Sequence, residues 1–343
     1  MAWFDTNCGQ IYHPIREIQE PGREIPSDLK WAVRLSANDQ IPMTNKAPSP
    51  NDQSARTRRS LMLGHLLVMG IWSLAIPGCT PPPPAATAKS PRIASLVSGS
   101  TYLILAMGAS DHLVAISNWD TARLEIAQLP RVGDYQSTDW EKLTEVKPEV
   151  MVIFVAPDRL PPGFRKRADE LGIRMVNVTM DRLDEIFKTI DDLGVILNET
   201  EKSAALKAKI RKQLDDVAHR VAGKDKVATL LARDEDGYAL IGGDTFVDDL
   251  LSIAGGRNVA SDIGMRYPSV DRERVQELSP QVIVQFMPDA SPQVIDRSRQ
   301  TWGKVEVPAV QNQQVYLLTD WYVLQPGSHI GEVAMKLSQI LHP

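Results

Sequence analysis

One tyrosine and one glutamate each occur twice in this chain at the same separation of 132 residues, and these four side chains are the first candidates for binding a ligand or partner. Residues 135–154 read YQSTDWEKLTEVKPEVMVIF and residues 267–286 read YPSVDRERVQELSPQVIVQF, an internal repeat at a constant offset of 132. It pairs Tyr135 with Tyr267 and Glu141 with Glu273. A glutamate can make charge-assisted contacts with a cationic partner, and a tyrosine ring can lie against a flat ligand. Both also have structural interpretations, since a glutamate in a helix's first turn favours its dipole and a tyrosine before a helix can be a core residue.

Signatures of common enzyme classes are absent from the sequence. It contains no P-loop, no G-x-S-x-G and no H-E-x-x-H, and the six histidines are scattered without metal-ligand spacing. The chain has 343 residues, 43% of them hydrophobic, and a formal net charge of −5. This is globular composition without a basic stripe, so we do not expect nucleic-acid binding. Because the enzyme signatures are absent, we expect neither catalysis nor a cofactor.

Each copy of the repeat predicts the same local structure: a short helix that begins after an Asp, a break at a Pro, and then a buried strand. A period this long does not suit a solenoid, so it predicts two similar lobes. Between the copies, residues 199–222 form one predicted helix, whose apolar stripe is Leu206, Ile210, Leu214, Val217 and Val221. A helix between two α/β units predicts a two-lobe protein with a stiff connection and a cleft that binds a ligand.

Strands and helices alternate through the rest of the chain, which favours parallel sheets covered by helices, with ligands at the carboxyl ends of the strands. We therefore expect an α/β fold with two Rossmann-like lobes joined by one long rigid helix. Among the other predicted helices are 183–197 and 330–341. Predicted strands include 92–97, 113–117, 150–155, 174–178, 226–231, 237–241 and 314–318.

The pattern of the first ninety residues indicates export and membrane-attachment signals rather than a folded domain. Residues 1–42 form an upstream extension, and residues 43–79 a signal peptide in which arginines precede an apolar run. Ile76-Pro77-Gly78-Cys79 resembles a bacterial lipoprotein cleavage box, so we expect lipid on Cys79 and a Pro-rich tether over 80–90. Export by the twin-arginine route is an alternative. After cleavage Cys8 is lost and Cys79 is blocked, which suits an oxidising compartment outside the cytoplasm.

From Arg92 onward the chain is similar to the periplasmic binding proteins that serve cobalamin and ferric-siderophore ABC importers. The matching stretches are RIASLVSGSTYLILAMGA (92–109), LPRVGDY (129–135), DWEKLTEVKPEVMVI (139–153), GGDTFVDDLLSIAGGRNV (242–259), YPSVDRERVQELSPQVIV (267–284) and VYLLTDW (315–321). The resemblance implies an N-terminal lobe over 91–198, a linking helix over 199–222 and a C-terminal lobe over 223–343. It also implies only slight closure on the ligand, because bending a continuous helix breaks backbone hydrogen bonds.

The resemblance assigns roles to individual residues. Glu141 and Glu273 would dock into arginine pockets of the two permease subunits, with the ATPase subunits beyond them. Tyr135 and Tyr267 would face the cleft, one from each lobe. Secondary ligand candidates, each with a structural alternative, are Trp119, Trp321, Arg266, Asp320 and Asp244. Many relatives carry Asp-Tyr-Pro after the second strand, where this chain has Thr121-Ala122-Arg123, so one cleft aromatic expected from the resemblance is missing. His329 is interpreted as the start of the last helix rather than as a ligand to haem iron.

The predicted function is thus a monomeric, lipid-anchored, extracytoplasmic receptor for a metal chelate. Paired tyrosines favour a corrinoid over a ferric siderophore, and haem or another metal complex is an alternative. A zinc or manganese receptor would need converging histidines, which are scarce here. An envelope lipoprotein that binds only proteins is the remaining rival.

Overall fold

The computed structural model describes residues 90–343, apart from 122, 157–158 and 235–237. Cys79, the signal peptide, the upstream extension and almost all of the tether lie outside the described residues. The described chain runs through β1 (Ile93–Ser95), α1 (Ser98–Ala106), a 3-10 turn (Ser110–His112), β2 (Leu113–Ala115), α2 (Trp140–Val146), β3 (Val150–Ile153), α3 (Phe164–Glu170), β4 (Arg174–Asn177), α4 (Leu183–Leu197) and α5 (Thr200–Val221). It continues through β5 (Val227–Arg233), β6 (Tyr238–Leu240), α6 (Phe246–Ile253), β7 (Gly256–Asn258), a 3-10 turn (Ser261–Ile263), β8 (Ser269–Val270), α7 (Arg272–Leu278), β9 (Val282–Phe286), α8 (Pro292–Trp302), α9 (Pro308–Gln311), β10 (Val315–Leu318) and α10 (Ile330–Leu341). The two helices predicted over 183–197 and 330–341 are confirmed as α4 and α10.

Two sheets form, one on each side of α5 in the sequence. The first has the order β2-β1-β3-β4 and is parallel throughout. In the second, β7, β5, β9 and β10 pair in the same parallel arrangement. Its edge is extended by β6, antiparallel to β5, and by β8, antiparallel to β6. The two-lobe α/β fold is thereby confirmed, and the antiparallel extension is an addition that the sequence did not predict.

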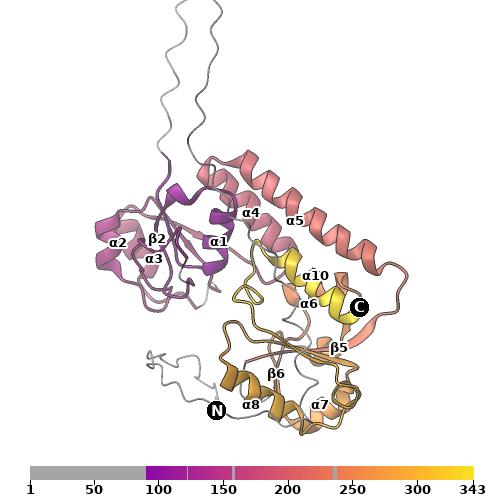
Figure 1. Ribbon diagram of the computed structural model, residues 1–343. Coiled ribbons are helices and arrows are strands. Elements are labelled where there is room, and N and C mark those ends of the chain that lie inside the picture. Colours follow the sequence, from indigo (N-terminus) through magenta and orange to yellow (C-terminus); the bar gives the residue numbers. More distant parts are fainter. Residues whose placement is uncertain (1–89, 122, 157–158, 235–237) are drawn as a thin grey trace, which may run out of the picture. The chain divides into compact units, whose positions relative to one another are not determined.

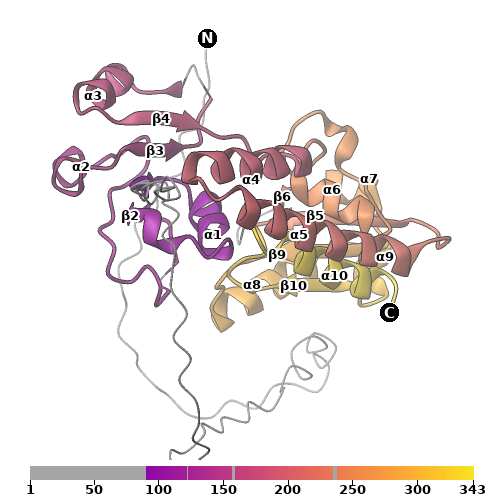
Figure 2. The ribbon, with the colours of Figure 1, turned by 90° about the horizontal axis from the view of Figure 1, so that it is seen from above.

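Helices cover both faces of each sheet, as alternate residues of the central strands require. On β3, Val150 and Val152 belong to the core that contains Leu103 of α1, whereas Met151 and Ile153 belong to the one that contains Leu143 of α2. Figure 2 shows α1 and α4 on one side of β3 and β4, and α2 and α3 on the other. In the second sheet, α6 and α10 share the first core, and the opposite face is covered by α7, α8 and α9.

The repeat has the predicted local structure in both lobes. Asp139 caps α2 by accepting a hydrogen bond from the Lys142 amide at 3.0 Å. Asp271 caps α7 in the same way, from the Arg274 amide at 2.8 Å. Both helices then end on a left-handed residue, and a buried strand follows, β3 in one sheet and β9 in the other. The two copies therefore belong to separate lobes.

The long helix α5 is continuous over its 22 residues, and its buried positions include the five predicted from the sequence. Near its start, Lys202 donates to the carbonyl oxygen of Gly108 in the first lobe at 3.3 Å. At its end, Arg220 donates to the carbonyl oxygen of His342 in the second, also at 3.3 Å. Figure 1 shows α5 with α4 and α10 packed beside it.

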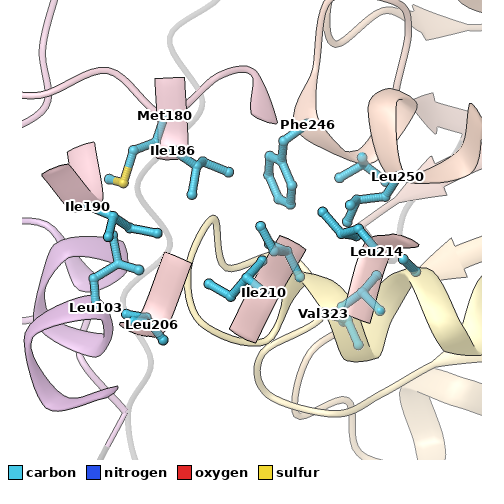
Figure 3. Packing of buried hydrophobic residues seen from close by; sticks show 14 of the residues in the cluster. Leu103, Met180, Ile186, Ile190, Leu206, Ile210, Leu214, Phe246, Leu250 and Val323 are labelled. Carbon is cyan, nitrogen blue, oxygen red and sulfur yellow. The ribbon is translucent and has the colours of Figure 1, made fainter. Parts of the chain in front are cut away.

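One apolar core continues from lobe to lobe along α5. Figure 3 shows Leu103 and Ile190 of the first lobe connected through Leu206, Ile210 and Leu214 to the second lobe, where Phe246 and Leu250 of α6 complete the cluster. Burying one such side chain stabilises a fold by about 1.5–3 kcal/mol. Separating the lobes at this level would expose several of them, so the core limits how far the lobes can move apart.

Candidate functional site

A cavity of about 270 Å³ is lined by residues of both lobes. The first lobe contributes the start of α1, Phe154 after β3, and Met180 and Asp181 after β4. The second contributes Phe246, Tyr267 and the 324–326 segment before α10. The cavity therefore lies at the carboxyl ends of β1, β3 and β4, the edge where the α/β pattern predicts a ligand.

Tyr267 is the predicted site residue that lines this cavity. Its side chain is 47% exposed, and the Arg233 guanidinium lies 5.1 Å from the centre of its ring. Burial, together with the nearby Asp181 carboxylate, raises the pKa of its hydroxyl, so this group stays protonated at neutral pH. The backbone on either side of Tyr267 is held by β6 and the residues just after it, because the Gly242 amide donates to Arg266 O and the Leu240 amide to Pro268 O, each at 2.8 Å.

Ion pairs connect the two lobes around the cavity. Arg266 of the second lobe donates to the Asp181 carboxylate of the first at 2.8 Å. In the opposite sense, Arg182 of the first lobe makes a bidentate pair with Asp249 of α6, at 3.0 and 2.7 Å, and bonds Asp244 at 2.7 Å. Two predicted ligand residues, Arg266 and Asp244, therefore have a partner in the other lobe in this structure.

Trp119 and Tyr135 lie in the first lobe and do not line the inter-lobe cavity. Trp119 is 70% exposed, and its indole nitrogen donates to the Asp134 carboxylate at 2.7 Å. Tyr135 is half-buried and lines a separate cavity of about 520 Å³ with Trp140, Phe164 and other residues of the first lobe. Tyr135 and Tyr267 were expected to face one cleft from opposite lobes, but in the structure each lines a different cavity.

Asp134 joins the segments that carry Trp119 and Tyr135. One of its carboxylate oxygens accepts the Trp119 indole, and the other accepts the amides of Gln136 at 2.8 Å and Ser137 at 2.9 Å. Partial burial opposes ionisation, but these hydrogen bonds outweigh it and lower the pKa of Asp134. The carboxylate is therefore charged, and a full acceptor, at neutral pH.

The buried side chain of Asp120 stabilises the turn that carries Trp119 through hydrogen bonds. This side chain is 4% exposed and accepts the Ser117 amide at 2.8 Å and the Thr101 hydroxyl at 3.2 Å. Its second oxygen is buried without a hydrogen-bond partner. Burial is the main cause that raises the pKa of Asp120 to about 6. Arg131 holds the same turn by donating to the carbonyl oxygens of Ser117 and Asp120, each at 2.9 Å.

Trp321 and Asp320 lie in a neighbouring aromatic cluster. The Trp321 ring is 4.7 Å from that of Tyr102 in α1 and 5.2 Å from that of His329. Arg123, in the stretch that replaces Asp-Tyr-Pro, lies 5.3 Å from the centre of the Trp321 ring. Asp320 accepts a bond from Lys336 at 3.0 Å, so its carboxylate is already paired.

His329 directly precedes α10, as predicted. Its ring stacks on Tyr322 at 4.6 Å, and its Nδ1 lies 3.1 Å from the Glu332 carboxylate.

Glu141 and Glu273 are both exposed and both lie in the first turn of their helices. That position suits the helix dipole and equally leaves the carboxylates accessible to a partner. Their surroundings differ, since Glu273 pairs with Arg272 at 3.2 Å, while no ion pair to Glu141 occurs within the described part of the chain.

Sequence reasoning missed Phe154, Met180, Asp181, Arg182, Phe246 and Asp249. Phe154 had a signal, because it is a large aromatic residue at the end of a predicted strand and matches Phe286 in the repeat. The ion pairs had none, since each forms between residues more than sixty positions apart.

No helix among the described residues combines the length and apolar character that crossing a membrane requires. A model of the periplasmic binding protein family matches residues 93–322. The vitamin B12-binding protein of Vibrio cholerae serotype O1 is 28% identical over 233 residues, which cover 67% of this chain and 82% of that protein. An uncharacterized ABC transporter substrate-binding lipoprotein of Bacillus subtilis, YvrC, is 24% identical over 262 residues, covering 74% of this chain and 81% of the relative.

Solved structures agree with the sequence comparison. The crystal structure of the periplasmic vitamin B12-binding protein BtuF of Vibrio cholerae superposes with a TM-score of 0.62 at 25% identity, over 74% of this chain and 96% of that one. The family resemblance predicted from the sequence is confirmed, and this chain belongs to the periplasmic binding protein family.

Proposed function

We propose that this protein is a non-catalytic receptor that captures a corrinoid between its two lobes and delivers it to an ABC permease. The observation that carries the proposal is the inter-lobe cavity, where Phe154 of one lobe and Phe246 and Tyr267 of the other supply aromatic surface. Aromatic rings offer a flat ligand a large contact area, and a tyrosine hydroxyl adds a hydrogen bond.

The size of the cavity defines how such a ligand is held. At about 270 Å³ it is smaller than the roughly 300–1,000 Å³ that encloses a typical small-molecule ligand. A corrinoid therefore rests across the cavity mouth with one edge inside, and the Arg266–Asp181 pair opens to admit it. Once open, Arg266 is available for a carboxylate or phosphate of the ligand, and Asp244 and Asp320 for its amides.

The choice of a corrinoid over a ferric siderophore or haem rests on the aromatic surface and on the relatives. The relative at 28% identity and the solved structure at 25% are both vitamin B12-binding proteins. We assign Trp119, Tyr135 and Trp321 to further ligand contacts outside the inter-lobe cavity.

Delivery is assigned to Glu141 and Glu273. They are exposed, stand on equivalent helices of the two lobes, and would contact cationic pockets of a two-fold permease at a fixed separation. The continuous helix α5 and the core along it keep that separation constant.

Attachment is assigned to lipid on Cys79, with the mature chain divided into the 91–198 lobe, the 199–222 helix and the 223–343 lobe. A related Bacillus subtilis protein is named a lipoprotein, which supports the anchor. Mass spectrometry of the mature N-terminal peptide tests it, and a peptide that retains residues before Cys79 would refute it.

The ligand is tested by calorimetric titration of the purified protein with cyanocobalamin, a ferric siderophore and haem. We expect saturable binding of cyanocobalamin at one site and at least tenfold weaker binding of the other two, the ratio that 1.4 kcal/mol of selectivity gives. Preferential binding of haem or the siderophore would overturn the ligand assignment, and binding of none of them would leave the protein-only envelope lipoprotein as the better account.

A further inference from the structure

The exposed Trp119 and the half-buried Tyr135 lie on separate segments of the first lobe. Trp119 belongs to the turn after β2, and Tyr135 follows a further loop that ends at the bridge between Ile116 and Arg131. An indole that is 70% exposed has little packing to fix its orientation, so a hydrogen bond has to do so.

Asp134 supplies that hydrogen bond and joins the two segments. Its Oδ2 accepts the Trp119 indole N–H at 2.7 Å, while its Oδ1 accepts the backbone amides of Gln136 and Ser137 and thereby holds the turn in which Tyr135 lies. The Thr138 hydroxyl also donates to the Asp134 carbonyl oxygen, which closes the turn.

We infer that Asp134 is a positioning residue for ligand binding: it orients the Trp119 indole, and holds the turn that carries Tyr135, for contact with a flat ring system such as a corrin. This inference rests on the proposed function for its ligand. The hydrogen bond between Asp134 and Trp119 is itself a feature of the structure and does not depend on that proposal.

Because one Asp134 oxygen bonds the indole and the other bonds the turn, a single substitution can remove the first contact and keep the second. In Asp134→Asn the amide oxygen can still accept both backbone amides of the turn. The amide NH₂ then faces the indole N–H, and two donors cannot bond. The turn of Tyr135 should persist while the hold on Trp119 is lost. Trp119→Phe removes the same hydrogen bond from the other side and keeps a ring.

The first measurement needs no ligand. In the ¹⁵N-labelled full chain, Trp119→Phe identifies the indole resonance of Trp119 by its disappearance. We expect this proton to exchange slowly with water in the wild type and to shift and exchange faster in Asp134→Asn. An unchanged resonance in Asp134→Asn would overturn the inference, whatever the ligand proves to be.

The second measurement is the affinity for cyanocobalamin. A charge-assisted hydrogen bond at an exposed site predicts about tenfold weaker binding for Asp134→Asn and for Trp119→Phe. Both substitutions remove the same hydrogen bond. The affinity of the double variant should therefore lie within about twofold of that of the more weakly binding single variant. Glu145→Gln, which removes a charge from an exposed site on α2, should bind like the wild type.

The urea midpoint separates positioning from a purely structural role. Trp119 is mostly exposed and the turn remains capped, so Asp134→Asn should keep the wild-type midpoint, whereas Asp134→Ala should lower it. Wild-type affinity in Asp134→Asn, or a loss of affinity that follows a fall in its urea midpoint, would contradict the inference. If the wild type itself binds no cyanocobalamin, the proposed ligand fails while the indole resonance still decides the role of Asp134.

Discussion

The two copies of the repeat have the same secondary structure and support their tyrosines by different means. Tyr267 lies two residues before β8, and its neighbours Arg266 and Pro268 are bonded by the backbone amides of Gly242 and of Leu240 in β6. Tyr135 lies in a turn that the Asp134 carboxylate holds. Among the described residues, the antiparallel β6–β8 extension belongs to the second lobe, and it accompanies this difference. A repeated sequence thus reproduces a helix and a strand, but what packs around them decides which cavity a side chain lines.

The lobes also differ in the polar group buried at the end of an equivalent strand. After β2 the first lobe buries the Asp120 carboxylate, and at the end of β7 the second buries the Asn258 amide, each 4% exposed. The amide is neutral, donates to Ile241 O and accepts the Ala260 amide. Only the first lobe therefore carries a buried group at this position that can change charge with pH.

The largest expected effect tests whether Glu141 and Glu273 make equivalent contacts with the permease, one from each lobe. Combining Glu141→Ala with Glu273→Ala should reduce corrinoid uptake by cells about 100-fold or more, since two charge-assisted contacts are lost at once. Cyanocobalamin affinity should stay within twofold of the wild type.

The repeat offers a matched control for this variant. Glu145 and Glu277 coincide at the same offset, lie four residues further along the same helices and are exposed. Glu145→Ala with Glu277→Ala should leave uptake near the wild-type level. A collapse of ligand affinity in the Glu141/Glu273 variant, or equal uptake by the two double variants, would remove the docking assignment.

The next prediction tests the turn that carries Tyr135, which has a glycine where the segment before Tyr267 has Met265. Gly133 has φ +85°, and a Cβ there would lie 1.8 Å from the carbonyl oxygen of Ser137, whereas the equivalent Met265 has no positive φ. Gly133→Ala should therefore cost about 3 kcal/mol of unfolding free energy, from backbone strain plus the clash.

Gly163→Ala is the control for strain without the clash. Its φ is +77° but nothing lies within 4 Å of the added Cβ, so about 1 kcal/mol is expected. Both values come from urea unfolding followed by circular dichroism. Equal costs for the two substitutions would mean that the 133–138 turn is not packed as described.

A further prediction concerns the pH dependence that Asp120 gives to the first lobe. Its folded pKa of about 6 exceeds the ordinary 3.8, so the proton binds the folded state more tightly than the unfolded one. This contribution to stability is fully present below about pH 4 and is lost as the pH rises through 6; it amounts to no more than about 3 kcal/mol.

Asp120→Asn should remove this pH dependence. Urea unfolding of both proteins from pH 4 to 7.5 should show the variant gaining stability relative to the wild type as the pH rises. Parallel curves would indicate that Asp120 is not buried as a carboxylate.

The sequence was sufficient for what depends on local pattern. The stripe on α5, the Asp caps of α2 and α7 and the bounds of α4 and α10 follow from periodicity and capping, which need only neighbouring residues. The short strands β7 and β8, of three and two residues, have too few positions for a period to appear.

The candidate site could be predicted only in part for the same reason. The resemblance placed both Tyr135 and Tyr267 at the cleft. In the structure Tyr267 lines the inter-lobe cavity and Tyr135 lines a cavity within the first lobe, a difference that two matching copies of a repeat do not reveal. The partners of Arg266 and Asp244 come from the opposite lobe, and no spacing in the sequence encodes that contact.

The most direct test of a ligand held between the lobes is the calorimetric affinity of Tyr267→Ala for cyanocobalamin, measured beside Tyr267→Phe. Removing a ring that lines the cavity should weaken binding at least tenfold, whereas the phenylalanine variant, which keeps the ring, should stay within about threefold of the wild type. Wild-type affinity in Tyr267→Ala would contradict a ligand site at the inter-lobe cavity.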